Sequence, residues 1–210
     1  MALNINKTAV TDYSSIDAHT IDGDALQTVT ESEETEYTNS RWTTDWIYFN
    51  RVPKLQSAIL MKAIWTVGKG YTCDARTKVI LEHITGDGKQ TFKDILFNLV
   101  VTKQIGRDSF AEIIRDEDTG LLLNLKILDP SNVRIIYNRK GIIKRYELIR
   151  KIQTEKETKT QVYARLEPRE VLHFRHNCFA GQIQGTSVPE MTETIILRDD
   201  ELRTLIQKVA

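Results

Sequence analysis

The segment that decides how this chain is organised is LEPREVLHFRHNCFAGQIQGTSVPE, residues 166–190. Pro168 restricts the backbone where the segment begins, and the apolar run that follows it is typical of a short strand. Two glycines then interrupt the pattern, and Ser187 is placed to cap a helix, with Glu190 three residues later completing a capping box. The segment therefore predicts a strand, a tight loop and a helix that starts at a defined residue.

The same segment carries three side chains that could perform chemistry, His173, His176 and Cys178. Imidazole and thiolate groups suit zinc. On a strand, however, His173 and His176 would point to opposite faces, and only His176 and Cys178 would share one. The other two histidines, His19 and His83, lie in an acidic leading segment and beside an expected helix end, so a fourth ligand is not evident. We therefore expect hydrogen-bonded strand histidines; a Cys/His nucleophilic pair is not favoured either, because no orienting partner is identified.

Two further patterns have a chemical alternative. Asp116, Glu117 and Asp118 form an acidic triplet that could hold Mg²⁺, but DEDTG joins two expected strands and ends in glycine, which favours a solvated turn. Gly68-Lys69-Gly70 resembles part of a phosphate loop, yet it lacks the required length and follows a helix where such a loop follows a strand. We therefore assign no catalytic, cofactor-binding or metal-binding residue from the sequence, and we expect no cofactor and no enzymatic activity.

The composition describes an ordinary soluble protein of 210 residues, with 40% hydrophobic and 28% charged residues. No window is long and apolar enough to cross a bilayer, and the N-terminus lacks the pattern of a signal peptide. Cys73 and Cys178 are too few and too far apart for a disulfide framework, which fits a reducing compartment. We expect assembly in a cytosol and no membrane partner.

Charge is divided unevenly along the chain. Residues 1–40 contain eight acidic residues against Lys7 alone, whereas residues 41–210 contain 28 basic and 21 acidic residues. The first part has too few large apolar residues to bury, so we expect a disordered or partner-ordered arm over residues 1–40. The remainder is mildly basic with scattered charge, which does not favour tight sequence-specific binding to nucleic acid.

The periodicity of residues 41–210 predicts an α+β fold in one domain. An aromatic cluster leads into a helix near Trp46–Val67, a short helix is expected over 76–84, and another runs from Thr91 to Lys103 with Thr91 as its N-cap. The middle of the chain alternates β-rich runs with the turns DEDTG, DPSN and NRKG, as in an antiparallel meander, and a charged loop is expected over 154–160. A C-terminal helix follows Ser187 to the last residue. We expect the aromatic cluster to be core or a subunit contact.

The order of these elements resembles the portal protein family of tailed bacteriophages and related viruses. Three ordered features carry the resemblance: a strand from Gly106 to Ile114 that leads into a hairpin; L-x-x-L-D-P-x-x-V at 125–133 with G-x-x-x-x-Y at 141–146; and L-x-P-x-E-V-L-H-F-R at 166–175 followed by G-x-S at 185–187. Residues 188–190, Val-Pro-Glu, depart from the small apolar stretch that usually follows in the family. The matched region is about residues 42–210.

The resemblance implies a portal wing-like domain at 41–210, with the stem, clip and crown absent from this chain. The helix that runs to residue 210 without a C-cap also suggests a fragment. A portal is a homo-oligomeric ring at one vertex of the virion, assembled in the host cytoplasm, through which double-stranded DNA passes without sequence specificity. The implied partners are sister subunits, capsid or scaffold protein, terminase and DNA. The implied role is structural, in genome packaging and ejection.

Two alternatives stay open at this point. The chain could be another oligomeric capsid or tail adaptor protein built on a similar α+β domain. It could also be a metal-dependent phosphodiesterase that uses Asp116, Glu117, Asp118 and His176.

Overall fold

The computed structural model describes residues 34–153 and 158–209, and it confirms an α+β fold with antiparallel sheets and a C-terminal helix. The helices are α2 (Trp42–Arg51), α3 (Pro53–Val67), α4 (Ala75–Glu82), α5 (Phe92–Gly106) and α6 (Val188–Val209). The strands are β1 (Glu34–Thr38), β2 (Asp108–Arg115), β3 (Leu122–Leu128), β4 (Val133–Asn138), β5 (Ile143–Gln153), β6 (Thr158–Leu166) and β7 (Val171–Arg175). Among the described residues, no helix has both the length and the apolarity that a membrane crossing needs.

The strands form two antiparallel sheets, where the sequence suggested one meander. One sheet has the order β1-β4-β5-β6 and the other β3-β2-β7. The chain changes sheets at the DPSN turn, which forms a short 3₁₀ helix, Pro130–Asn132, capped by the Asp129 carboxylate as it accepts a bond of 2.9 Å from Ser131 N. It returns at the second 3₁₀ helix, Pro168–Glu170, which delivers β7 next to β2. These two direct crossings, from β3 to β4 and from β6 to β7, therefore each include a proline at the start of a 3₁₀ helix.

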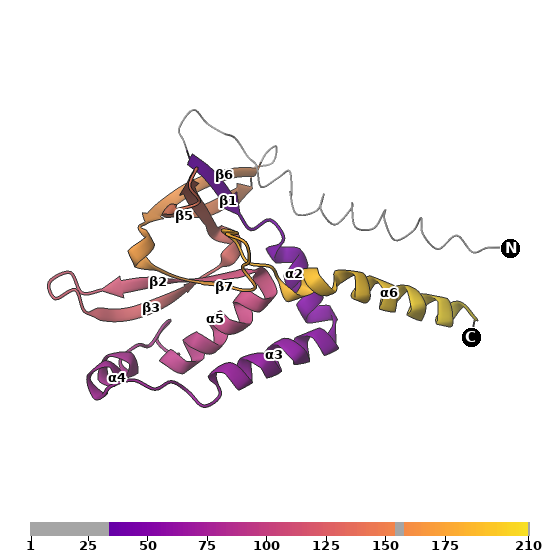
Figure 1. Cartoon of the computed structure of the whole chain (residues 1–210), viewed down its shortest axis with the longest axis horizontal. Helices are drawn as coiled ribbons and strands as arrows, with labels where there is room; N and C mark the ends of the chain where they lie inside the picture. The colour runs from indigo at the N-terminus through magenta and orange to yellow at the C-terminus, as the bar shows by residue number, and fades with distance from the viewer. Residues whose placement is uncertain (1–33, 154–157, 210) are drawn as a thin grey trace.

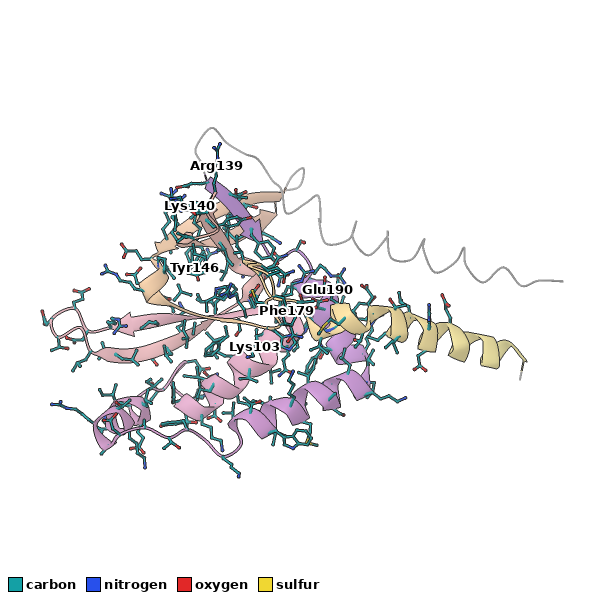
Figure 2. The ribbon with its side chains drawn as sticks, viewed as in Figure 1. Lys103, Arg139, Lys140, Tyr146, Phe179 and Glu190 are labelled. Carbon is teal, nitrogen blue, oxygen red and sulfur yellow. The ribbon has the colours of Figure 1, made fainter. Side chains whose placement is uncertain are left out.

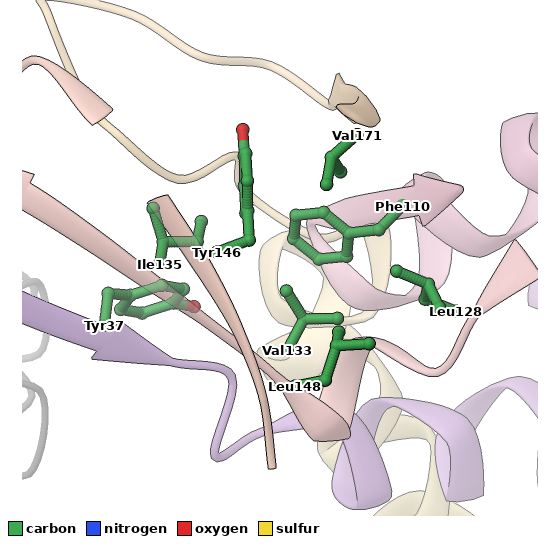
Figure 3. Close-up of a cluster of buried hydrophobic side chains, with 8 residues drawn as sticks. All are labelled: Tyr37, Phe110, Leu128, Val133, Ile135, Tyr146, Leu148 and Val171. Atoms are coloured by element: carbon green, nitrogen blue, oxygen red, sulfur yellow. The ribbon is translucent and has the colours of Figure 1, made fainter. Parts of the chain in front are cut away.

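Buried side chains fill the space between the two sheets (Figure 3). Phe110 on β2 and Val171 on β7 contribute from the three-stranded sheet, opposite Val133 and Tyr146 from the four-stranded sheet. The rings of Phe110 and Tyr146 meet edge to face with their centroids 5.9 Å apart. Complete burial of apolar and aromatic side chains of this size is the main favourable term in folding.

Strand β2 is buried on both faces because neighbouring residues point into different cores. Phe110 faces the four-stranded sheet, whereas Ala111 faces α5 and packs with Ile95 and Leu99. The result is three layers, with the four-stranded sheet, the three-stranded sheet and then the helices α3, α4 and α5 (Figure 1). The centre of the molecule is thus the β2 strand and its connection to α5.

The helix expected at Trp46–Val67 is two helices. Val52 has an extended backbone, with φ −109° and ψ 95°, and separates α2 from α3, which has Pro53 in its first turn. The proline itself explains the break, since it disfavours a helical conformation for the residue before it. The short helix expected at 76–84 is α4, and Thr91 is the N-cap of α5 as predicted.

The disordered or partner-ordered arm was expected to extend to residue 40, but Glu34–Thr38 form β1 at the edge of the four-stranded sheet. Tyr37 is buried between the sheets, and Glu34 pairs with Arg145 at 2.9 Å, so this stretch has the apolar anchor and the charge partners that an acidic composition alone does not reveal. Residues 1–33 of the arm lie outside the described residues. So do 154–157 of the expected charged loop, whereas 158–160 begin β6.

The N-cap of α5 gives a direct test of the helix assignment. Thr91 Oγ accepts a bond of 3.2 Å from Asp94 N, and the Asp94 carboxylate accepts one of 2.9 Å from Thr91 N. We expect Thr91→Ala to lower the free energy of unfolding by about 1 kcal/mol in urea denaturation, since one backbone donor loses its partner. The matched control is Thr66→Ala at an exposed position of α3, expected to change stability by less than about 0.5 kcal/mol. Equal effects of the two substitutions would contradict the capping assignment.

Candidate assembly interface around the base of the C-terminal helix

Helix α6 begins against the layered body and then extends away from it (Figure 1). Its first turn has the predicted capping box. Glu190 N donates to Ser187 Oγ over 3.1 Å, and Ser187 N donates to the Glu190 carboxylate over 3.4 Å. Ser187 is completely buried, so the helix starts inside the body.

Two ion pairs fix the first two turns of α6 to different parts of the body. Arg107, at the α5–β2 connection, pairs with Glu190 at 2.8 Å, and Arg41, before α2, pairs with Glu193 at 2.9 Å. The Tyr48 hydroxyl donates a second bond to Glu193 over 3.1 Å. Figure 2 shows Glu190 where α6 meets the rest of the molecule. These contacts from separate elements determine the direction in which α6 leaves.

The loop before α6 passes very close to the α5–β2 connection. His176 N donates to Arg107 O over 2.8 Å, and Thr186 N donates to His176 O over 2.7 Å. A Cβ at Gly185 would overlap both of those carbonyl oxygens, which explains the glycine at this position. Arg107 itself has a φ of 71°, a conformation that L-residues adopt rarely and that ends α5 sharply.

His173 is part of a buried hydrogen-bonded chain beneath this loop. Its Nε2 lies 3.1 Å from the Asp108 carboxylate, and its Nδ1 lies 3.0 Å from the Tyr146 hydroxyl. Asp108 also accepts a bond of 3.1 Å from Gly185 N. Burial raises the pKa of Tyr146 to about 12, so its hydroxyl stays protonated and can donate to Nδ1. The chain links β2, β5, β7 and the loop, and none of its members lines either of the grooves described below.

The other metal candidates do not gather around His173. Strand β7 ends at Arg175, and Asn177 has a φ of 47°, so the strand alternation used for His176 and Cys178 does not extend to them. His176 bonds Thr186 O through Nδ1 at 2.7 Å, and the Cys178 thiol donates to Gln182 O over 2.8 Å. The described part of the chain contains no group of three or more His, Cys, Asp or Glu residues positioned to hold a metal ion.

The acidic triplet of the phosphodiesterase alternative lies at the β2–β3 turn, at the end of the molecule opposite α6 (Figure 1). Asp116 accepts bonds from the backbone N and the hydroxyl of Thr119 over 2.8 and 2.7 Å, and the Thr119 hydroxyl, as the first cause, lowers the pKa of Asp116. Asp118 and Glu117 are exposed in the same turn. The structure therefore does not bring the triplet together with His176.

Apolar side chains line two grooves, one of which lies at the α6 base. A groove of about 380 Å³ runs between the start of α3 and α6, and Ile195 on its α6 side is 69% exposed. A second groove of about 640 Å³ lies between α2, α5 and the DPSN turn. Its lining includes Trp42 and Trp46, whose stacked rings have centroids 5.7 Å apart. Phe49, which belongs to the same aromatic cluster in the sequence, is buried. Sequence periodicity did not reveal these exposed positions, because an apolar residue reads the same whether a neighbouring chain or its own core covers it.

Asp45 on α2 is fully buried beside this junction, and both its carboxylate oxygens lack a hydrogen-bond partner at direct distance. Burial raises the pKa of Asp45 to about 6, against the opposing influence of the Ser187 hydroxyl and of the Arg41 and Arg107 guanidinium groups. Arg41 lies 3.9 Å from the carboxylate. The base of α6 therefore contains a buried acid whose ionised form is only partly compensated.

Comparison with known proteins places the fold. No protein-family model matches the sequence, and no curated protein matches it. Among solved structures, the fold is similar to that of a chain described as belonging to the virion of a native gene transfer agent particle, with a TM-score of 0.59 at 12% sequence identity. The match covers 81% of this chain and 44% of that chain, so this chain spans less than half the length of its neighbour. At this identity, the likeness shows a shared fold.

The state of Asp45 predicts a pH-dependent stability. Its pKa of about 6 in the folded chain lies above the ~4 of an exposed aspartate, so the folded state binds this proton more tightly and stability falls as pH rises from about 4 to 6. We expect Asp45→Asn to be more stable than the parent chain by about 1–3 kcal/mol at pH 7, with the difference vanishing near pH 4. Urea denaturation from pH 4 to 8 measures it.

The control for this experiment is Asp118→Asn in the exposed β2–β3 turn, for which the difference from the parent chain should stay near zero at every pH. An Asp45→Asn variant that is less stable than the parent chain at pH 7 would mean that the buried carboxylate is fully compensated. That result would contradict the partial compensation inferred for Asp45.

Proposed function

We propose that this protein is a structural subunit of a phage-like virion, and that within it the chain forms the wing portion of a portal ring. The observation that carries the proposal is the fold, which over 81% of the chain matches that of a chain from a gene transfer agent virion. The three ordered motifs of the portal resemblance support the finer assignment, because they occupy structurally connected places in this fold.

Those places are the points where the chain changes layers. The L-x-x-L-D-P-x-x-V element of residues 125–133 covers the end of β3 and the crossing into β4. The element at 166–175 covers the crossing back and β7, and G-x-S at 185–187 is the close passage that starts α6. These elements are separated in sequence, and the loop that contains Gly185 contacts the α5–β2 connection through its backbone. The motifs therefore support a role in which the geometry of the junction is the function.

The shape of the α6 junction suits assembly into a ring. A helix that leaves the body in a fixed direction, with exposed Ile195 and Met191 near its base, offers one half of a contact, and the apolar groove between α2, α5 and the DPSN turn offers the other. Contacts of this head-to-tail kind close into rings when the rotation between copies divides a full turn. Sister subunits, capsid or scaffold protein, terminase and double-stranded DNA are the partners that a portal would have, and the role is structural rather than enzymatic.

Assembly can be measured on the purified chain. We expect sedimentation velocity to show a concentration-dependent large species, and electron microscopy to show closed rings with an axial channel. Ile195→Asp should weaken association at least about tenfold, because a charge would be buried at the contact. The matched control is Val79→Asp, which changes an exposed apolar residue of α4 in the same way and should leave assembly unchanged.

The outcomes separate the finer proposal from the broader one. A chain that stays monomeric at about 100 µM, or an Ile195→Asp variant that assembles like the parent chain, contradicts the contact proposed at α6. Closed assemblies without an axial channel would support another oligomeric capsid or tail adaptor protein and overturn the portal assignment.

A further inference from the structure

Three basic side chains from distant parts of the sequence meet on one side of the helical layer. Lys62 on α3 lies with its Nζ 3.4 Å from Nε2 of His176, which follows β7. Lys103 on α5 places its Nζ 5.8 Å from the centre of the Phe174 ring. Lys103 and Lys62 are close enough to repel each other, and burial together with this repulsion lowers the pKa of Lys103. Figure 2 shows Lys103 on α5 near the base of α6.

The histidine in this cluster acts as a neutral hydrogen-bond acceptor for Lys62. His176 is buried, and its Nδ1 lies 2.7 Å from Thr186 O, a carbonyl that can only accept. Nδ1 therefore carries the proton and Nε2 accepts from Lys62. Burial and the two lysines lower the pKa of His176, which agrees with a neutral ring. The cluster thus holds two positive charges, on exposed Lys62 and half-buried Lys103.

No acidic side chain balances those charges in the part of the chain that the structure describes. The three segments that build the cluster, residues 53–73, 95–107 and 171–187, contain no aspartate and no glutamate. The acids in the first two turns of α6 are already engaged, Glu190 with Arg107 and Glu193 with Arg41. Two other exposed lysines, Lys78 and Lys126, do have acidic partners, Glu82 and Glu112. Two neighbouring cations left unpaired in this way are suited to an external anion.

The surroundings favour a nucleic-acid strand over a protein carboxylate as the source of that anion. Trp65 follows Lys62 by three residues on α3, which puts the two side chains on adjoining positions of the helix surface, and it is 79% exposed. Phe179, three residues after His176, is 67% exposed. Proteins that bind single-stranded nucleic acid contact its phosphates with lysine or arginine side chains. They stack its bases on exposed aromatic rings close by.

We propose that Lys62 and Lys103 form a binding site for backbone phosphates of single-stranded nucleic acid, with Trp65 as a stacking platform for a base. The site uses side chains of α3 and α5, and neither lysine lines either of the two apolar grooves. It does not depend on ring formation, so it can be tested on the chain in any oligomeric state.

The experiment is a fluorescence-anisotropy titration of the full chain with a labelled 20-nucleotide single strand and with the corresponding duplex, from 50 to 200 mM salt. We expect the single strand to bind more tightly than the duplex. The double variant Lys62→Ala/Lys103→Ala should lower affinity for the single strand by about tenfold or more at 50 mM salt, and reduce the slope of log K against log salt by about 1.4, since two phosphate contacts are lost. Lys62→Arg/Lys103→Arg should retain most of the affinity.

The matched control is Lys78→Ala/Lys126→Ala, which removes the same net charge from two exposed, acid-paired lysines and should change affinity less than about twofold. Should the double variant at the cluster fail to fold, as judged by its urea midpoint, Lys103→Ala alone keeps the Lys62–His176 bond and should give about half the change in slope.

Several results would overturn the proposal. One is an equal loss of affinity for the single strand in the cluster variant and the control variant. Others are tighter binding of the duplex than of the single strand, and no binding by the parent chain. A fourth is a cluster variant that changes the oligomeric state while oligonucleotide binding is unaffected. The last result would identify a carboxylate of a second copy as the anion.

Discussion

Arg107 is the residue on which the remaining structure depends. Its backbone, with a φ of 71°, ends α5 and turns the chain directly into β2, the strand buried on both faces. Its carbonyl oxygen accepts the backbone bond from His176, and its guanidinium pairs with Glu190 at 2.8 Å. One residue therefore joins the helical layer, the central sheet, the loop after β7 and the first turn of α6. A largely buried arginine at such a position needs its partner in place, since an uncompensated buried charge is strongly destabilising.

This arrangement favours a defined direction for α6 over maximal stability. Buried ion pairs contribute little net stability, and Asp45 adds an acid that burial keeps from ionising freely. We interpret the polar junction as a means of specifying geometry, because apolar packing alone tolerates small rotations of a helix and directional bonds do not. The exposed apolar residues on α6 and α3 then occupy fixed positions relative to the grooves, as the proposed contacts between copies would require.

The sequence predicted the features that depend on neighbouring residues. The caps at Thr91 and Ser187 and the turns at DEDTG and NRKG are local patterns, and they occur where expected. The break at Val52 was also predictable, since Pro53 follows it. The division into two sheets was not, because partner choice between strands is set by contacts far apart in sequence, and β1 was hidden by its acidic composition. The Lys62–Lys103–His176 cluster was likewise invisible, since its members are brought together only by the packing of α3, α5 and β7.

The central claim is that the polar junction holds α6 in one direction relative to the body. The most direct measurement is the distance distribution between spin labels at Leu197 on α6 and Val79 on α4, two exposed positions, in a Cys73→Ser/Cys178→Ser background. A rigid junction predicts a single narrow distance that broadens when Arg107→Ala removes the pair with Glu190. A distribution that is already broad in the parent chain, or one that Arg107→Ala leaves unchanged, would contradict the account.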